Sequence, residues 1–377
     1  MAPDNVTSLI LLLLRHVPSE EHLDGARELI RSVTDWQRLI HISLVHGVAP
    51  LIYSRISAWS DLPEEVREGF KKAYLHNVAD TERSSFELRE IVSSLKAAGA
   101  EAVPIKGVIG TEEVYGDLSL YPSSDIDIMV RARDVPATIT VMKKMGYHPE
   151  PEITANYLDC YDELHFLKDG AKPVDVHFRL GKRRYFDMPE DFWWEDLRNQ
   201  DFRGHRYQVL SYEKTILFAV IHLFQHGYSP LKFLVNISEM LNVYDGKVNW
   251  LKLKEDASQA GICKPLSLSL CFARDLLGTP IPKAISSVVE NLSFKDRWIY
   301  KRIKGNLFKG NISLSAETFL LTILQYNAAE VVKRMLKWIF PSVKEVACRY
   351  NVPRKSGAVY IYYLLNPVLL LLKRKNK

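Results

Sequence analysis

Apolar residues recur every three or four positions along roughly the first ninety residues, a spacing that predicts helices. Four segments carry the pattern, and the last ends at Gly99, where glycine suits a helix stop. The four expected helices cover residues 5–17, 21–33, 35–56 and 63–99. The chain therefore begins with a helical amino-terminal region.

The pattern then changes to short apolar stretches with two-residue alternation, which is typical of strands. Strands are expected at residues 100–107, 125–130, 147–151, 162–170 and 172–180, with helices at 108–116 and 134–146 between them. Residues 188–211 read as a connecting segment anchored by Trp193 and Trp194, and helical spacing returns from Tyr212 to the end. This order predicts an α+β protein in which helical regions flank a mixed sheet.

The predicted limits divide the 377 residues into three parts. These are an amino-terminal helical region at 1–74, a mixed α/β core at 75–187 and a carboxyl-terminal helical domain with a basic tail at 188–377. An apolar fraction of 47% supplies enough material for a sizeable core.

The net charge of +5 hides an asymmetry, because residues 294–377 hold 17 Lys and Arg against 4 Asp and Glu. Such a region can meet nucleotide phosphates, nucleic acid or anionic lipid, and a solvated helical surface explains it equally well. The chain shows no RNA- or DNA-binding motif, so nucleic acid is disfavoured as a partner.

Four scattered cysteines without a CxxC pair argue against a disulfide framework or a zinc site and favour the reducing cytoplasm. Near the end, the apolar run in "GAVYIYYLLNPVLLLLKRKNK" is interrupted by Asn366 and Pro367 and is too short to span a bilayer. We expect this segment to dock on the protein's own core. The alternative is a helix in peripheral contact with the inner membrane face through its basic tail.

Two carboxylates one residue apart, Asp125 and Asp127, lie on an otherwise apolar strand in "YPSSDIDIMV". Residues i and i+2 of a strand share a face, and two like charges there raise each other's pKa unless a cation neutralises them. Asp175 alternates with valines in "KPVDVHFRL" and would join the pair if the two strands are neighbours. Three carboxylates suit a hard divalent cation, with Mg²⁺ expected and Mn²⁺ as an alternative.

A turn at Lys106 and Gly107 ends the first strand just before a short helix. Main-chain N–H groups at such a turn attract anions, and the lysine adds a positive charge. We expect a phosphate-binding cradle here.

These elements together resemble the nucleotidyltransferase superfamily of DNA polymerase β type. The segments "IKGVIGTEEVYGD", "SSDIDIMV", "MGYHPE" and "VDVHFRL" are similar to the family called uncharacterised nucleotidyltransferase family 5, and the similarity extends over "LSYEKTILFAVIHLFQHG". The resemblance implies a minimal polymerase β-like core in which Asp125, Asp127 and Asp175 are catalytic and bind the metal. It also implies that Asp175 takes the acceptor's proton.

The same resemblance implies that Lys106, Gly107, Ser123 and Ser124 contact a nucleoside triphosphate such as ATP. For Lys106 and Gly107, the general argument that such a turn binds phosphate supports the same role.

Acceptor or orienting roles are expected for His177, His222, His226 and Lys232. Lys232 replaces an arginine of many relatives, as Tyr121 does four positions before the Asp pair, and Asn236 replaces an aspartate. These differences bear on nucleotide choice and phosphate contacts. For the i, i+4 histidine pair, helix packing and zinc ligation are alternatives to a place in the active-site cleft.

The leading hypothesis is magnesium-dependent transfer of a nucleoside monophosphate from an NTP to an acceptor hydroxyl, with release of pyrophosphate. The acceptor is a small molecule, a peptide or a glycan. The alternatives are a non-catalytic nucleotide-binding module and a membrane-associated accessory protein of surface polysaccharide or peptide modification.

Overall fold

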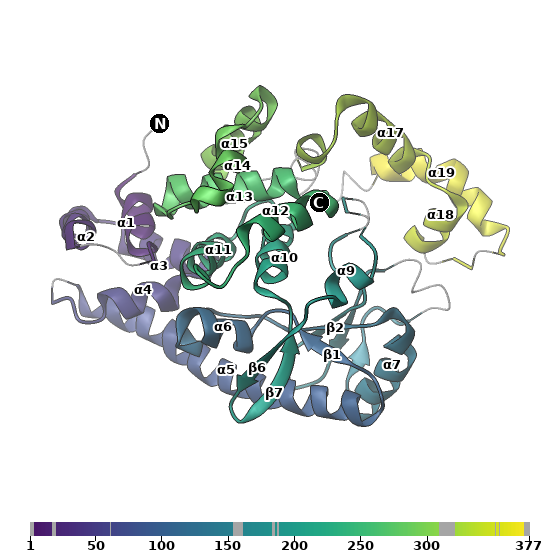
Figure 1. Cartoon of the computed structure of the whole chain (residues 1–377), viewed down its shortest axis with the longest axis horizontal. Coiled ribbons are helices and arrows are strands. Elements are labelled where there is room, and N and C mark those ends of the chain that lie inside the picture. Colours follow the sequence, from purple (N-terminus) through teal and green to yellow (C-terminus); the bar gives the residue numbers. More distant parts are fainter. Residues whose placement is uncertain are drawn as a thin grey trace.

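A computed structural model describes residues 4–16, 20–60, 62–153, 161–182, 185–186, 188–308, 321–350, 352–353 and 355–372. The fold is α+β, as the sequence predicts: along the chain, a five-stranded mixed sheet follows a helical amino-terminal region and precedes a helical carboxyl-terminal region. Figure 1 shows the strands in the lower half of the molecule. All five strands come from one continuous part of the chain, residues 102–177, so one helical region precedes the sheet and the other follows it.

The amino-terminal region is helical, with one difference from the prediction. Its helices are α1 (Asn5–Leu13), α2 (Glu20–Ser32), α3 (Trp36–Val45), α4 (Ala49–Ile56) and α5 (Glu64–Ala97). The single helix expected over 35–56 is wrong because Gly47 has a φ of 65° and separates α3 from α4. A Cβ at Gly47 would also lie 2.7 Å from Cδ of Lys232, so the turn packs closely on that side chain.

The five strands of the sheet follow the order β1-β2-β5-β4-β3. They are β1 (Ala102–Pro104), β2 (Ile126–Val130), β3 (His148–Pro149), β4 (Glu163–Leu167) and β5 (Val174–His177). The central strands β2 and β5 are parallel, and the other pairs are antiparallel. The helices α6 (Val108–Tyr115) and α7 (Val135–Lys144) connect strands, as expected.

One face of the sheet is apolar because alternate residues of β2 and β5 point the same way. Ile128 and Val176 are fully buried there, in a cluster with residues of α5 and α7. The opposite face is left for the polar residues of the same strands.

The connecting segment contains structure that the sequence did not predict. A short helix α9 (Asp191–Trp194) precedes a hairpin of β6 (Arg198–Phe202) and β7 (His205–Val209). Its two-residue turn places Arg203 and Gly204 at φ values of 50° and 76°, as hairpin turns of this length require. Trp193 and Trp194 are buried, as expected of anchoring residues.

The remainder of the chain is helical, as predicted. Its helices are α10 (Tyr212–Gln225), α11 (Leu231–Val243), α12 (Trp250–Gln259), α13 (Cys263–Leu277), α14 (Ser286–Glu290), α15 (Phe294–Asn306), α17 (Ala328–Ile339), α18 (Val343–Arg349) and α19 (Ala358–Leu372). One apolar cluster joins α1–α4 with α10–α15, whereas α18 and α19 share a small cluster of their own. The three domain limits stay predictions. Within the described residues, no helix combines the length and the apolar character needed to cross a membrane.

The sequence argument against a disulfide framework did not anticipate a single disulfide. Cys348 is disulfide-bonded, whereas Cys263 and Cys271 are free thiols. A disulfide requires two Cα atoms within about 4.4–6.8 Å of each other, and spacing along the sequence does not reveal such an approach.

Candidate functional site

The candidate site is built on the polar face of β2 and β5. The parallel register sets Asp127 opposite Asp175 and Met129 opposite His177. Since the valines on either side of Asp175 are buried on the other face, the carboxylate points to the same side as Asp127. The two strands are therefore neighbours, which is the condition for the three carboxylates to act together.

Asp127 is the most enclosed carboxylate of the site, with 1% of its surface exposed. Its Oδ1 accepts hydrogen bonds from Nζ of Lys106 and from Nε2 of His177, each at 2.9 Å. Burial alone would raise the pKa of Asp127, but Lys106 and His177 hold it below its ordinary value, so the group is ionised. The other oxygen, Oδ2, is buried and has no hydrogen-bond partner among the described residues.

His177 links Asp127 to a carboxylate on the next strand. Its Nδ1 lies 3.1 Å from Oε2 of Glu163. Burial would lower the pKa of His177, but the hydrogen bonds to Asp127 and Glu163 raise it to about 9. At neutral pH the ring is therefore a cation that donates from both nitrogens, one to Asp127 and the other to Glu163.

Asp125 stands just before β2 and is partly exposed. Burial and the charge of Asp127 raise the pKa of Asp125, and Lys106 opposes this shift only in part. The hydroxyl of Ser123 donates to the main-chain oxygen of Asp125 at 2.8 Å, which fixes the turn that leads into the strand. Ser124, beside them, is exposed.

Asp175 contacts a histidine that sequence reasoning missed. Its Oδ1 is hydrogen-bonded to Nδ1 of His165, on the antiparallel neighbour β4. The register sets His165 opposite Asp175 and Glu163 opposite His177, so β4 adds two polar side chains to the same face. The alternation in "ELHFL", where Glu163 and His165 alternate with buried Leu164 and Phe166, is the signal that could have revealed both.

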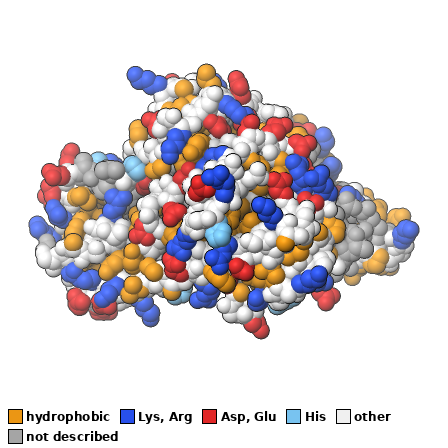
Figure 2. Space-filling view, turned by 60° about the horizontal axis from the view of Figure 1, so that its bottom comes forward, with side chains coloured by type: hydrophobic (Ala, Val, Ile, Leu, Met, Phe, Trp, Pro, Cys, Tyr) orange, Lys and Arg blue, Asp and Glu red, His pale blue; other side chains and the backbone are white. Residues whose placement is uncertain are grey.

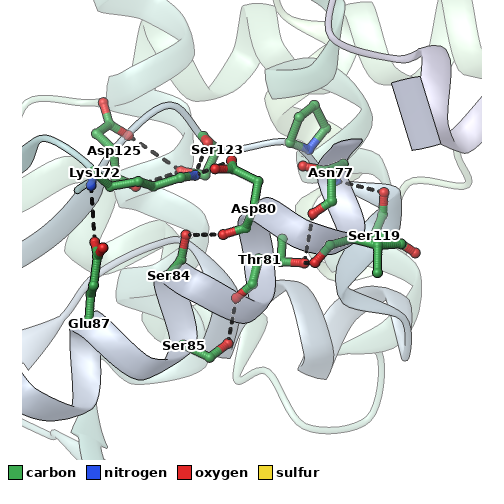
Figure 3. Close-up of polar contacts among 12 residues, drawn as sticks. Asn77, Asp80, Thr81, Ser84, Ser85, Glu87, Ser119, Ser123, Asp125 and Lys172 are labelled. Carbon is green, nitrogen blue, oxygen red and sulfur yellow. Dashed lines mark hydrogen bonds and ion pairs between the residues drawn. The ribbon is translucent and has the colours of Figure 1, made fainter. Parts of the chain in front are cut away.

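A buried lysine, also missed, ties the loop before β2 to the long helix α5 (Figure 3). Nζ of Lys172 lies 2.6 Å from Oδ2 of Asp80 and donates to the main-chain oxygen of Ser123. The main-chain N–H of Lys172 donates to Oε2 of Glu87 at 3.1 Å. One side chain therefore joins α5, the loop that carries Asp125 and the segment that leads into β5.

The turn at Gly107 forms the N-cap of α6. Gly107 has a φ of 87°, a backbone conformation that residues other than glycine rarely adopt. A Cβ there would meet no atom within 4 Å, so the main chain faces open space. Free N–H groups at this helix start can receive an anion, and the ammonium of Lys106 lies beside them.

The helices α10 and α11 supply the opposite side of the site. Nζ of Lys232 donates to the main-chain oxygen of Pro122 at 2.9 Å. Burial lowers the pKa of Lys232, and the charge of Asp125 opposes this shift. The rings of His222 and His226 stack with centroids 4.5 Å apart. Burial and the charge of Lys106 lower the pKa of His222, so this ring is neutral.

The donor set fits a hard divalent cation rather than zinc. Ligand atoms of Asp127, Asp175 and His177 lie within 4.8 Å of one another, and among the described residues this is the group that could hold a metal. Of the three predicted carboxylates, Asp127 and Asp175 belong to this group and Asp125 does not. Both ring nitrogens of His177 face carboxylates, those of Asp127 and Glu163, so the oxygens of Asp127 and Asp175 are the ligands that suit a hard cation. The histidine pair of α10 is not part of this group, which leaves the zinc alternative without a third ligand there.

Comparison with known proteins agrees with this geometry. The sequence pattern of a family described as uncharacterised nucleotidyltransferase matches residues 32–278, which include every strand and the helices α10–α13. No curated protein matches the chain significantly. The matched region covers more than half of the chain and contains the carboxylates, the Lys-Gly turn and the paired histidines, so the chain belongs to this nucleotidyltransferase family.

Proposed function

We propose that the protein transfers a nucleoside monophosphate from an NTP to an acceptor hydroxyl in a Mg²⁺-dependent reaction that releases pyrophosphate. The observation that carries the proposal is Asp127, an ionised carboxylate at 1% exposure whose Oδ2 has no hydrogen-bond partner among the described residues. A buried charge in that position calls for a further cation.

The charges of the site support a metal. Asp125, Asp127, Asp175 and Glu163 supply four carboxylates. Lys106 and His177 are the two cations bound directly to Asp127, and burial together with the charge of Asp127 raises the pKa of Asp125. Asp125, Asp127 and Asp175 would hold Mg²⁺, with Mn²⁺ as a substitute, and the metal would neutralise charge on the triphosphate.

The nucleotide would lie along the Lys106–Gly107 turn. Main-chain N–H groups at the start of α6 and the ammonium of Lys106 are donors for phosphate oxygens, and the open space over Gly107 lets a phosphate approach the backbone. Lys232 approaches the Asp125 loop from α11 and would contact the triphosphate from the other side. Ser123 and Ser124 would complete the contacts from the loop.

In the reaction, the acceptor oxygen forms a bond to the α-phosphorus while the bond between that phosphorus and the bridging oxygen breaks. Pyrophosphate leaves with the electron pair of the broken bond. The proton of the acceptor passes to Asp175, and His165, which is bound to Asp175 and partly open to solvent, can carry it onward.

The neutral His222, with His226 stacked on it, would orient the acceptor, since its buried Nε2 has no partner among the described residues. His177 holds Asp127 in place. A small molecule, peptide or glycan is proposed as the acceptor.

The test uses purified protein, Mg²⁺ and each of four α-labelled NTPs, with a cell extract as the source of acceptors. Wild type is compared with Asp125→Asn/Asp127→Asn, with Asp175→Asn and with Asp169→Asn, an exposed carboxylate of the same domain that serves as the control. We expect wild type and the control to move label to an acceptor. The two site variants should lose at least about a hundredfold of the activity.

Binding of the same NTPs is measured in parallel by equilibrium dialysis. If no NTP is transferred and nucleotide binding survives the double substitution, the chain is a non-catalytic nucleotide-binding module. If label is transferred equally well by Asp175→Asn, the assignment of the base is wrong.

A further inference from the structure

The carboxyl-terminal helices expose apolar stripes that the nucleotidyltransferase site does not use. On α17 the exposed residues Val332, Met335 and Leu336 follow one another at i, i+3 and i+4, which places them on one face, and exposed Phe340 is the C-cap residue just past the helix. Half of the surface of Leu336 is exposed, at 52%. Soluble proteins seldom leave a contiguous face of large aliphatic side chains open to water.

A second stripe lies on α19. Tyr360, Ile361, Leu364 and Leu365 are exposed at i, i+1, i+4 and i+5, and Leu364 reaches 76% exposure. We call the eight residues of the two stripes the carboxyl-terminal apolar face. In Figure 1 α17 and α19 lie side by side, and residues of the two helices are in contact.

The exposed stripes belong to a well-fixed unit. Asn366, fully buried, donates from Nδ2 to the main-chain oxygen of Ile339 at 2.7 Å and accepts from Arg349 and Tyr350, also at 2.7 Å. These bonds join α17, α18 and α19, and Val359 turns inward to the small core between α18 and α19. α19 therefore docks with one face on α17 and α18, whose apolar cluster is separate from the main core, and its opposite face is exposed.

The carboxyl-terminal part of the chain is rich in positive charge. Residues 321–377 contain 11 Lys and Arg against 2 Asp and Glu. Lys333 and Lys337 stand one turn apart on α17 beside its apolar stripe, and both are exposed. Figure 2 shows orange and blue side chains next to each other at the right-hand end of the molecule, where α18 and α19 lie.

We propose that the carboxyl-terminal apolar face docks on a bilayer surface rich in anionic lipid. Aliphatic side chains flanked by Lys and Arg suit a helix that lies in the interface, with its apolar side among the acyl chains and its cations among the phosphates. A second copy of the chain fits less well, because two such basic faces would repel each other. Docking of this kind needs no spanning helix, and none is found among the described residues.

The proposal is independent of the nucleotidyl transfer reaction and is tested with the full chain. Flotation with phosphatidylcholine vesicles, with and without phosphatidylglycerol, compares wild type with Leu336→Glu/Leu364→Glu and with Lys333→Glu/Lys337→Glu. The control is Leu251→Glu, which changes an equally exposed leucine of α12, at 63% exposure. Circular dichroism and gel filtration with light scattering record folding and mass for each variant.

We expect wild type and the control to float only with vesicles that contain phosphatidylglycerol. Both double variants should bind these vesicles at least about tenfold more weakly. High salt should weaken the binding of wild type. Two results would overturn the proposal: failure of wild type to float with either vesicle, or a dimer in solution that Leu336→Glu/Leu364→Glu alone abolishes. Equal loss in the Leu251→Glu control would overturn it as well.

Discussion

Replacement of Lys172 by methionine tests whether the ion pair with Asp80 holds the Asp125 loop in place. The Lys172 side chain is 6% exposed and that of Asp80 is 21% exposed. Removing one partner of a buried pair costs about 3–5 kcal/mol because the other charge is left uncompensated. Since Asp80 keeps some contact with water, we expect Lys172→Met to lower the free energy of unfolding by about 3 kcal/mol.

The pair is isolated by a double-mutant cycle with Asp80→Asn. When both charges are removed, neither is left buried and alone, so the double variant should lose about 2 kcal/mol less than the sum of the two single losses. The matched control is Lys71→Met on α5, the helix that also carries Asp80. Lys71 forms an ion pair with Glu68 at 2.8 Å, but both side chains are about half exposed, and we expect a loss below about 0.5 kcal/mol.

The assay is urea unfolding followed by circular dichroism, together with Mn²⁺ binding followed by electron paramagnetic resonance. Because Lys172 also holds the main-chain oxygen of Ser123, Lys172→Met should weaken Mn²⁺ binding about tenfold or more, as changes behind metal ligands commonly do. A coupling energy near zero, or a Mn²⁺ affinity equal to that of Lys71→Met, would refute the reasoning.

Three further predictions concern single side chains of the site. Gly107→Ala should cost about 1–2 kcal/mol of stability through its φ of 87° alone, since the new Cβ meets no neighbour. A loss in urea unfolding no larger than that of Gly110→Ala, a change at a half-buried glycine inside α6, would contradict it. Lys232→Gln should raise KM for the NTP about tenfold in steady-state kinetics and leave unfolding nearly unchanged; an unaltered KM would remove Lys232 from the phosphate contacts. The pKa of His177 is raised to about 9 in the folded chain, so its stabilising contribution is complete below about pH 6.5 and is lost as the pH rises towards 9. The free energy of unfolding should fall by about 3 kcal/mol over that window in wild type and in the control His205→Gln, but not in His177→Gln.

The carboxylate face could be predicted because strand alternation is a local property. In β2 and β5 the residues beside each aspartate are large and aliphatic, and their burial forces the aspartates to the opposite face. Which strands pair is not a local property, and the sequence argument could only assume that β2 and β5 are neighbours. The structure shows that they pair in parallel, across about fifty residues of the chain.

Other elements were missed because their signals are weak or distant. The hairpin was missed because β6 is polar apart from Phe202 and its turn is Arg-Gly rather than Asn-Gly, so the alternation of Tyr207 and Val209 in β7 stands alone. Lys172 meets Asp80 from 92 positions away along the chain, and nothing in the sequence around either residue names its partner.

The polar residues of β4 are a different case, because their signal was present and was not used. The stretch "ELHFL" alternates in the same way as "VDVHF", and an antiparallel neighbour places its polar side chains on the face that β5 uses. Glu163 and His165 then fall opposite His177 and Asp175, where one fixes the charge of a histidine and the other contacts the proposed base. Alternation therefore carries information about the surroundings of a catalytic strand as well as about the strand itself. Variants at His165 are the place to test this, since loss of transfer with Mn²⁺ binding intact would separate proton movement from metal binding.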